Sequence, residues 1–200
     1  MSVEKAFRVL AAFGRQHPTL NLSQVASVAG MDVSSAQRFT HTLTKLGFLK
    51  KDPDTKRFEL TPKTLDLGHH FFRSNRLVDR AMPYLMHLSK ETEETVNLTM
   101  LEDTEIIFVS RFLSRNVLNT DVIIGTRMPA YATAPGIAML SRLPEDEAMA
   151  IIDASDLKAH TPSTTWQREA LRQKLRSRRR RATPPPSRRS ISATPRSRPP

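Results

Sequence analysis

Polar and basic side chains recur at helical spacing between residues 34 and 46. Ser34, Arg38, His41 and Lys45 share one face of a helix, because residues three and four apart lie side by side. Short groups near the helix start permit close approach, and longer groups further along reach base edges and phosphates in a major groove. The pattern predicts hydrogen bonding to nucleic acid. The candidate contacts in this segment are Ser34, Ser35, Gln37, Arg38, His41, Thr42 and Lys45.

Two predicted helix starts and a turn would hold this face in position. Asn21 and Ser34 each stand three residues before a glutamine, the spacing of a capping box. Gly30 supplies the permissive backbone that a tight turn needs. We therefore predict a helix-turn-helix over Leu22–Leu49, with its recognition helix at 34–46. The helices alone leave an ordinary amphipathic hairpin with a solvated face equally open.

Apolar residues predict how these helices pack. The inward positions expected from the first helix, the turn and the recognition helix are Val25, Ala29, Met31, Val33, Ala36, Phe39, Leu43 and Leu46. A preceding helix over Val3–Gln16 would close the core. Its expected inward stripe is Val3, Ala6, Phe7, Leu10 and Phe13.

A basic hairpin follows the recognition helix and favours the DNA-binding interpretation. Phe48–Lys51 and Phe58–Thr61 are predicted strands around a turn-forming Asp-Pro-Asp-Thr cluster. Such a wing can contact phosphates or a neighbouring groove. The candidate wing contacts are Lys50, Lys51, Lys56 and Arg57. Residues 1–62 thus predict a winged helix-turn-helix DNA-binding domain.

The remainder predicts a second, α+β domain behind a linker. Residues 63–93 suggest a linker of two helices, over 63–73 and 77–91, with a kink or restart at Pro83. Residues 94–175 are predicted to form a partial effector-binding domain. In the latter we expect a hairpin over 95–102 and 106–112, and a strand at Asp121–Gly125. Helices are expected at 134–141, from Pro144, and at 166–175. The cluster His69–Phe72 is hard to cover within one small subunit, which favours a dimer contact.

Composition narrows the class of protein. The chain has no cysteine, which excludes disulfides, thiolate metal sites and a cysteine nucleophile. Its six histidines lack metal-ligand spacing, and no nucleotide-binding or serine-hydrolase motif occurs. We expect no enzyme activity, no cofactor and no metal. We find no membrane span or signal peptide in the sequence and expect a cytoplasmic protein.

The net charge of +11 is unevenly distributed. Residues 1–63 hold 10 Lys/Arg and 5 Asp/Glu, residues 64–170 hold 10 and 15, and residues 171–200 hold 11 and none. The first two segments therefore carry +5 and −5, and the last carries +11. A basic head on an acidic body is typical of a DNA-binding domain joined to one that does not bind DNA.

The runs SVEKAFRVLAAFG, LSQVASVAGMDVSSAQRFTHTLTKLGFL and RFELTPKTLDLG resemble the IclR family of bacterial transcriptional regulators. Further on, GTRMPAYATAPGIAMLSRLP is similar to that family's effector-domain signature. The resemblance implies a GAF-like effector domain, a homodimer or dimer of dimers, and a small organic-acid or aromatic effector. It implies effector contacts at Met128, Pro129, Thr133, Ala134 and Gly136. Tyr131 stands where the family commonly has His, which leaves the ligand class open.

The C-terminal tail, residues 176–200, is rich in Arg and Pro and has almost nothing apolar, so we expect it to be disordered. One interpretation is a native basic arm that adds salt-sensitive DNA affinity. The favoured one is out-of-frame translation, because IclR-type effector domains continue well beyond this point. A C-terminally truncated or frameshifted effector domain predicts DNA binding that ignores effectors. The nucleotide sequence would decide between the two.

The leading functional hypothesis is a sequence-specific DNA-binding transcriptional regulator that binds double-stranded DNA as a dimer. The alternative is a ligand-sensing or scaffolding protein whose helix-turn-helix mediates protein contacts. A third hypothesis is general RNA binding driven by the arginines of the tail. Salt dependence separates the first two, because neutralised phosphates release counterions.

Overall fold

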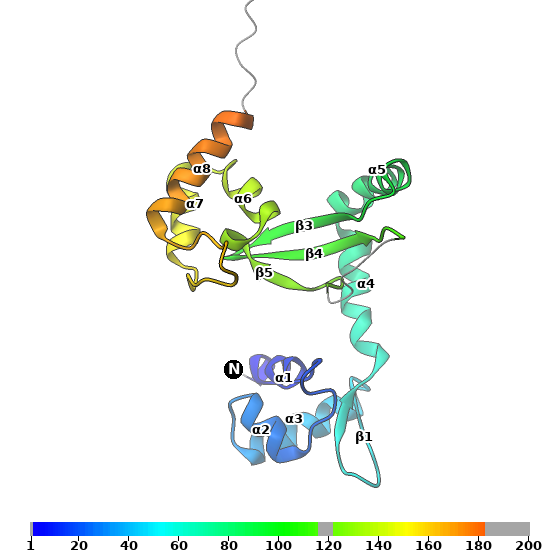
Figure 1. The fold of residues 1–200 in the computed structure, drawn as a ribbon. Helices are drawn as coiled ribbons and strands as arrows, with labels where there is room; N and C mark the ends of the chain where they lie inside the picture. The colour runs from blue at the N-terminus through cyan, green and yellow to red at the C-terminus, as the bar shows by residue number, and fades with distance from the viewer. Residues whose placement is uncertain (1, 116–121, 183–200) are drawn as a thin grey trace, which may run out of the picture. The chain divides into compact units, whose positions relative to one another are not determined.

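The computed structural model describes residues 2–115 and 122–182, and it divides into two compact units (Figure 1). The boundary between the two units falls between Asp79 and Arg80. Helices and short antiparallel sheets occur in both, which confirms the predicted α+β class.

The N-terminal unit is a winged helix-turn-helix. Its helices α1, α2 and α3 span Ser2–Ala11, Leu22–Val28 and Val33–Lys45. Strands β1 (Leu49–Lys51) and β2 (Phe58–Leu60) pair antiparallel, with Leu49 opposite Leu60. A 3₁₀ turn η1 (Pro62–Thr64) and helix α4 (Leu65–Ser74) follow. The core contains Val9, Phe13, Leu20, Val25, Ala36, Leu43, Leu49 and Phe58.

Helix α1 is shorter than expected, and three of the five predicted inward positions of this segment, Ala6, Leu10 and Phe13, are half-buried or buried. It ends at Ala11 and directs Val9 inward, followed by buried Ala12 and Phe13. Val3 and Phe7 are 69% and 55% exposed, so the predicted inward stripe is wrong at these two positions. Apolar residues occupy more than one side of this segment, so periodicity alone could not select the buried side.

Helix α3 begins one residue earlier than the predicted 34–46, and its N-cap is Asp32 rather than Ser34. The Asp32 carboxylate accepts hydrogen bonds from the backbone N–H and hydroxyl of Ser35, both at 2.7 Å. The carboxylate thus satisfies two donors, one with each of its oxygen atoms, whereas Ser34 already lies inside the helix. The other predicted capping box, Asn21 with Gln24, is confirmed. Val33, the first residue of α3, and Leu46, which follows its last residue, are exposed, contrary to expectation.

The C-terminal unit has a three-stranded antiparallel sheet in the order β3-β4-β5. Strands β3 (Val96–Glu102) and β4 (Glu105–Phe112) confirm the predicted hairpin. The third strand, β5, is Arg127–Pro129 instead of Asp121–Gly125. Residues 122–125 form no strand, and Asp121 lies outside the described residues. Helix α5 (Arg76–Thr92) precedes the sheet and continues through Pro83 as one helix, so no restart occurs there.

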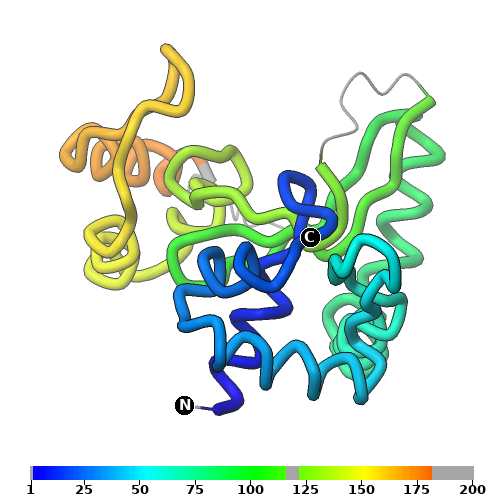
Figure 2. Tube along the Cα trace, turned by 90° about the horizontal axis from the view of Figure 1, so that it is seen from below, coloured from blue at the N-terminus to red at the C-terminus, as the bar shows by residue number. Residues whose placement is uncertain are grey.

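Three helices gather at one end of this sheet (Figures 1 and 2). After the 3₁₀ turn η2 (Ala130–Ala132), they are α6 (Ala134–Leu140), α7 (Glu145–Asp153) and α8 (Arg168–Ala182). Their shared core includes Ile106, Tyr131, Ile137, Leu140, Met149, Ile152, Leu171 and Leu175. Residues 176–182 continue α8, so the expectation of disorder from residue 176 is wrong for this part of the tail. The rest of the predicted tail, residues 183–200, lies outside the described residues.

Candidate nucleic-acid interface

The polar face of α3 borders a hollow of about 430 Å³ in the N-terminal unit. Ser34, Gln37, Arg38 and His41, four of the seven predicted α3 contacts, line it together with Lys51 of the wing. The remaining lining residues are Leu22, Thr40, Thr44 and Phe58. The hollow thus joins the predicted recognition face to the base of the wing.

The other predicted contacts of α3 lie around this hollow. Thr42 and Lys45 are exposed, and Ser35 is half-buried beside its cap Asp32. The Thr42 hydroxyl donates to the carbonyl of Arg38 at 3.0 Å. Thr44 lines the hollow as well. It was not among the predicted contacts, although its place three residues after His41 on the same helix could have indicated it.

Hydrogen bonds within the turn shape the wing. Asp52 accepts from the backbone N–H groups of Asp54 at 2.9 Å and Thr55 at 2.7 Å. The bond from Thr55 is the main reason why the pKa of Asp52 lies below its usual value. Lys56 adopts a positive φ of 58°, and its ammonium donates a hydrogen bond to the carbonyl oxygen of Pro53 at 2.5 Å. This compact turn fixes the position from which the wing lysines extend.

The two strand lysines differ in their surroundings. Lys50 forms an ion pair with Glu59 on the facing strand. The Lys51 ammonium lies 5.3 Å from the centre of the Phe58 ring, within reach of a cation–π interaction. Both side chains remain exposed. To bind a phosphate, Lys50 would have to give up its ion pair with Glu59. Lys51 forms no ion pair with any residue that the structure describes, so it could bind a phosphate without losing one.

Arg57 is half-buried and connects the wing to the start of α2. Its Nε donates to the Thr19 hydroxyl at 2.9 Å, and its Nη2 donates to the Thr19 carbonyl at 2.9 Å. Nη2 also lies 3.1 Å from Oε1 of Gln24, the oxygen that caps Asn21. Among the wing residues singled out from the sequence, Arg57 therefore has a structural role in the free protein. Nothing in its local sequence signals this partner, because Thr19 is 38 residues away.

Backbone pairing strengthens the same connection. Leu20 and Phe58 exchange two hydrogen bonds, of 3.0 and 2.8 Å, in an isolated antiparallel bridge. The backbone between α1 and α2 thus pairs with β2 at Leu20, beside the two strands of the wing. Together with Arg57, this bridge anchors the wing to the helix-turn-helix.

The predicted effector contacts fall on different kinds of surface. Met128 and Pro129 belong to β5, Ala134 is exposed at the start of α6, and Gly136 is buried. Thr133 caps α6 by accepting from the Gly136 amide at 3.2 Å, so this amide already has a partner.

Gly136 packs directly against η2. A Cβ at this position would lie 2.1 Å from the Ala130 carbonyl oxygen, closer than atoms can approach. Beside it, the hydroxyl of Tyr131, a residue that is 1% exposed, accepts from the Lys158 amide at 3.0 Å. The same hydroxyl lies 3.0 to 3.1 Å from the carbonyls of Asp156 and Lys158 and from Nε2 of His160. Gly136 and Tyr131 therefore have clear packing roles.

The structure of residues 2–115 and 122–182 gives no support for a metal site or a membrane-spanning helix. There, no three His, Asp or Glu side chains gather in a way that could hold a metal ion. None of the described helices combines the length and apolar character needed to cross a bilayer.

Comparisons with known proteins match both units. Residues 2–53 match the family described as the IclR helix-turn-helix domain. Residues 69–184 match the family described as bacterial transcriptional regulator IclR C-terminal.

Two curated relatives are the Pca regulon regulatory protein of Pseudomonas putida and the HTH-type transcriptional regulator XynR of Escherichia coli. The first is 30% identical over 171 residues, which cover 85% of this chain and 58% of the relative. The second is 28% identical over 170 residues, covering 85% and 68%. The chain thus spans less than two thirds of the Pca regulon protein.

Solved structures have the same fold. A transcriptional regulator from Rhodococcus sp. RHA1 superposes with a TM-score of 0.75 at 31% identity, covering 90% of this chain and 71% of that one. An IclR transcriptional regulator from Alicyclobacillus acidocaldarius gives 0.76 at 25% identity, covering 90% and 72%.

Proposed function

This chain belongs to the IclR family of bacterial transcriptional regulators, and we propose that its N-terminal unit recognises duplex DNA by sequence. In this role α3 enters the major groove, and Gln37, Arg38 and His41 contact base edges. Lys45 and the wing residues Lys50, Lys51 and Lys56 contact phosphates. The protein acts in the cytoplasm as a regulator and not as an enzyme.

The observation that carries this proposal is the polar face of α3. Arg38, His41 and Lys45 are exposed, and none of them forms an ion pair with a residue that the structure describes. Their hydrogen-bonding groups remain available beside a hollow of about 430 Å³. A long arginine can then reach the acceptors of a guanine, which a bidentate guanidinium matches.

We assign Arg57 a different part in this function. Because its guanidinium already bonds Thr19 and Gln24, it supports DNA binding by holding the wing in place. The lysines of the wing supply its phosphate contacts.

A homodimer is the assembly that this role requires. Two-fold pairing would present two recognition helices to two half-sites, the usual arrangement for such regulators. Exposed apolar side chains on α4 and α5 can be buried in the contact between the two subunits. They are Leu65, Leu67, Phe71, Leu77, Tyr84, Met86 and Leu88. The exposure of Phe71 agrees with the dimer contact expected at His69–Phe72.

The test begins with selection of a binding site from random duplexes by the purified chain. Arg38→Ala should then weaken binding to the selected site by about 1–3 kcal/mol, roughly 5- to 150-fold, because a bidentate base contact is lost. Binding to random duplex should weaken much less. Lys45→Ala is the matched control, and it should weaken both equally. Equal losses for Arg38→Ala would demote Arg38 to a phosphate contact.

Salt dependence tests the function as a whole. Affinity for the selected site should fall steeply as salt rises, with a slope of about 0.9 per neutralised phosphate. A protein whose helix-turn-helix mediates only protein contacts would select no DNA site and show no such slope.

We propose effector sensing as the role of the C-terminal unit, with a small organic acid or aromatic compound as the ligand class. Met128, Pro129, Thr133 and Ala134 remain the candidate contacts, whereas the paired and buried Gly136 amide supports the fold of α6. A fluorescence titration of the selected duplex with such compounds tests this proposal. A ligand-dependent change in DNA affinity would support it, whereas DNA affinity that ignores these compounds would contradict it and would agree with the truncated effector domain expected from the sequence.

A further inference from the structure

Helix α8 carries two rows of basic side chains, one on each side of the leucines that it buries. Leu171 and Leu175 face the core and are at most 6% exposed. The paired row, named for its carboxylate partners, consists of Arg168, Arg172 and Arg176 at spacings of four residues. The open row, which lies on the other side of the leucines by helical periodicity, consists of Lys174, Arg178 and Arg181.

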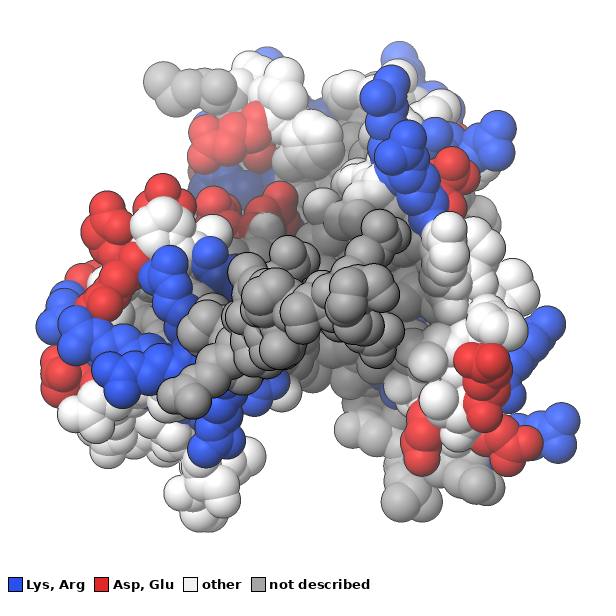
Figure 3. Space-filling model, turned by 90° about the horizontal axis from the view of Figure 1, so that it is seen from above, with Lys and Arg blue, Asp and Glu red and all other residues white. Residues whose placement is uncertain are grey.

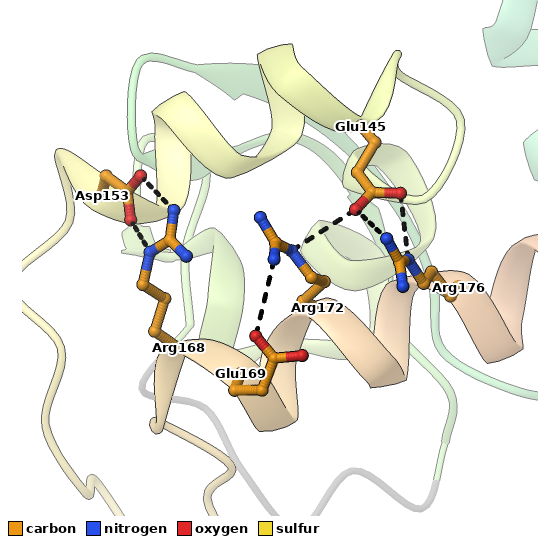
Figure 4. Close-up of polar contacts among 6 residues, drawn as sticks. All are labelled: Glu145, Asp153, Arg168, Glu169, Arg172 and Arg176. Carbon is orange, nitrogen blue, oxygen red and sulfur yellow. Dashed lines mark hydrogen bonds and ion pairs between the residues drawn. The ribbon is translucent and has the colours of Figure 1, made fainter.

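Carboxylates neutralise the paired row (Figure 4). Arg168 binds Asp153 through two hydrogen bonds of 2.5 and 2.8 Å. Arg176 binds Glu145 through two of 2.7 and 3.0 Å, and Arg172 Nε lies 3.3 Å from the same Glu145. These contacts lower the pKa values of Asp153 and Glu145 below their usual range, chiefly through the hydrogen bonds from Arg168 and Arg176. The paired row therefore fastens α8 to α7.

The open row has no such counterpart. All three of its side chains are exposed, and none forms an ion pair with a residue in the described part of the chain. Lys174 and Arg178 are four residues apart and Arg178 and Arg181 three, so like charges stand next to each other on the helix surface. Such neighbours repel, and a bound anion would relieve the repulsion. Figure 3 shows Lys and Arg side chains gathered on the part of the molecule that holds α8.

We propose that the open row binds the phosphate backbone of duplex DNA without reading its sequence. The row extends about 10 Å along the helix axis. A duplex carries one charge per roughly 1.7 Å of its axis, so several phosphates can face the row at once. Membrane docking fits less well, because α8 buries its leucines and the apolar side chain four residues before Lys174 is only the small, half-buried Ala170, which offers a bilayer little apolar surface. This second DNA-binding surface goes beyond the sequence recognition proposed for α3.

The experiment compares two triple variants of the full chain. One carries Lys174→Gln, Arg178→Gln and Arg181→Gln, and thus neutralises the open row. The matched control carries Arg80→Gln, Lys90→Gln and Arg142→Gln, which remove the same charge from exposed positions of the same unit. Circular dichroism and thermal unfolding verify that both remain folded. Fluorescence anisotropy then measures the affinity for a random-sequence duplex over a salt series.

We expect the open-row variant to reduce the slope of log affinity against log salt by up to about 2.7, at roughly 0.9 per lost phosphate contact. The control should keep the wild-type slope. A charge-retaining variant, Lys174→Arg with Arg178→Lys and Arg181→Lys, should also keep it. Equal slopes for the open-row variant and the control would overturn the proposal. Tighter binding to single-stranded RNA than to duplex DNA would overturn it as well.

The outcome is separable from that of the α3 proposal. The open-row variant should still prefer a selected site over random duplex by the wild-type ratio, because α3 is unchanged. Loss of this ratio in the open-row variant would mean that the row contributes to specificity, contrary to the proposal. Conversely, Arg38→Ala should lower the ratio while the effect of the open-row substitutions on the salt slope persists.

Discussion

Helices α3 and α8 are both basic on their exposed sides, yet they use their cations differently. On α3, Arg38 and Lys45 are exposed and have no carboxylate bound to them among the described residues. On α8, Arg168 and Arg176 each bind a carboxylate of α7 with two hydrogen bonds. One helix leaves its cations open to a partner, and the other uses a whole row of them to hold its own fold.

The difference shows why a count of basic residues cannot locate a DNA-binding surface. The last 30 residues hold 11 Lys/Arg and no acid, more basic charge than residues 1–63 carry. Part of that charge is nevertheless neutralised by Glu145, which stands earlier in the sequence. The position of the nearest carboxylate decides whether a cation is available.

The largest expected effect concerns what holds α8 in place. Leu171 is fully buried, so Leu171→Ala should destabilise the C-terminal unit by about 2–5 kcal/mol through lost burial and the cavity left behind. Chemical denaturation followed by tryptophan fluorescence measures this, since Trp166 lies just before α8. The control Leu113→Ala changes a leucine of the same unit that is 57% exposed, and it should cost far less. Equal losses would mean that α8 is not part of the core.

A smaller effect is expected where the N-terminal unit, too, uses an arginine for its own fold. Arg57→Gln removes the fork that joins the wing to Thr19 and Gln24, and should cost about 1–2 kcal/mol, since hydrogen bonds to charged groups are lost. Amide hydrogen exchange at Leu20 and Phe58 should accelerate. The salt slope for DNA binding should remain that of the wild type.

Arg57→Lys separates charge from geometry at this position, because it keeps the cation and loses the planar fork. It should accelerate exchange almost as much as Arg57→Gln does. Recovery of wild-type exchange in Arg57→Lys would show that charge alone anchors the wing.

The ion pairs of α8 should contribute less than its leucines. Glu145→Gln removes the carboxylate shared by Arg172 and Arg176. Arg176 and Glu145 are 57% and 42% exposed, so the loss is modest and screened by salt. The C-terminal unit should unfold slightly earlier in low salt, and the difference from wild type should fade in high salt. A loss as large as that of Leu171→Ala would reverse this order of contributions.

The smallest effect is a pH dependence in the N-terminal unit. Hydrogen bonds from the Ser35 amide and hydroxyl hold the pKa of Asp32 below its usual 3.8. The native state therefore binds fewer protons than the unfolded state, and the cap's contribution is present above pH 3.8 and lost as pH falls through the lowered value. The stability difference between wild type and Asp32→Ala should shrink on acidification. A difference that stays constant down to about pH 2 would exclude an ionised cap.

The helices and strands were predicted best where residues close together in the sequence determine the local structure. The wing strands, the Asn21 cap and the β3–β4 hairpin depend on residues a few positions apart, and the structure confirms them. The cap of α3 was predicted at Ser34, whereas the structure has it at Asp32, whose carboxylate accepts both hydrogen bonds from Ser35. Arg57 shows the limit of such reasoning for the site. Its type indicates a cation, but its partner Thr19 comes from a distant part of the chain.

The tight contact between Gly136 and Ala130 has a consequence for how the chain tolerates substitution. In a library of all single replacements, residue 136 should accept glycine alone, because any Cβ meets the Ala130 backbone within 2.1 to 2.6 Å. At Gly14 and Gly68 a Cβ would meet no atom within 4 Å, so both positions should accept many side chains. Glycine is thus interchangeable at two places in this protein and irreplaceable at a third, and selection for a folded C-terminal unit would separate them.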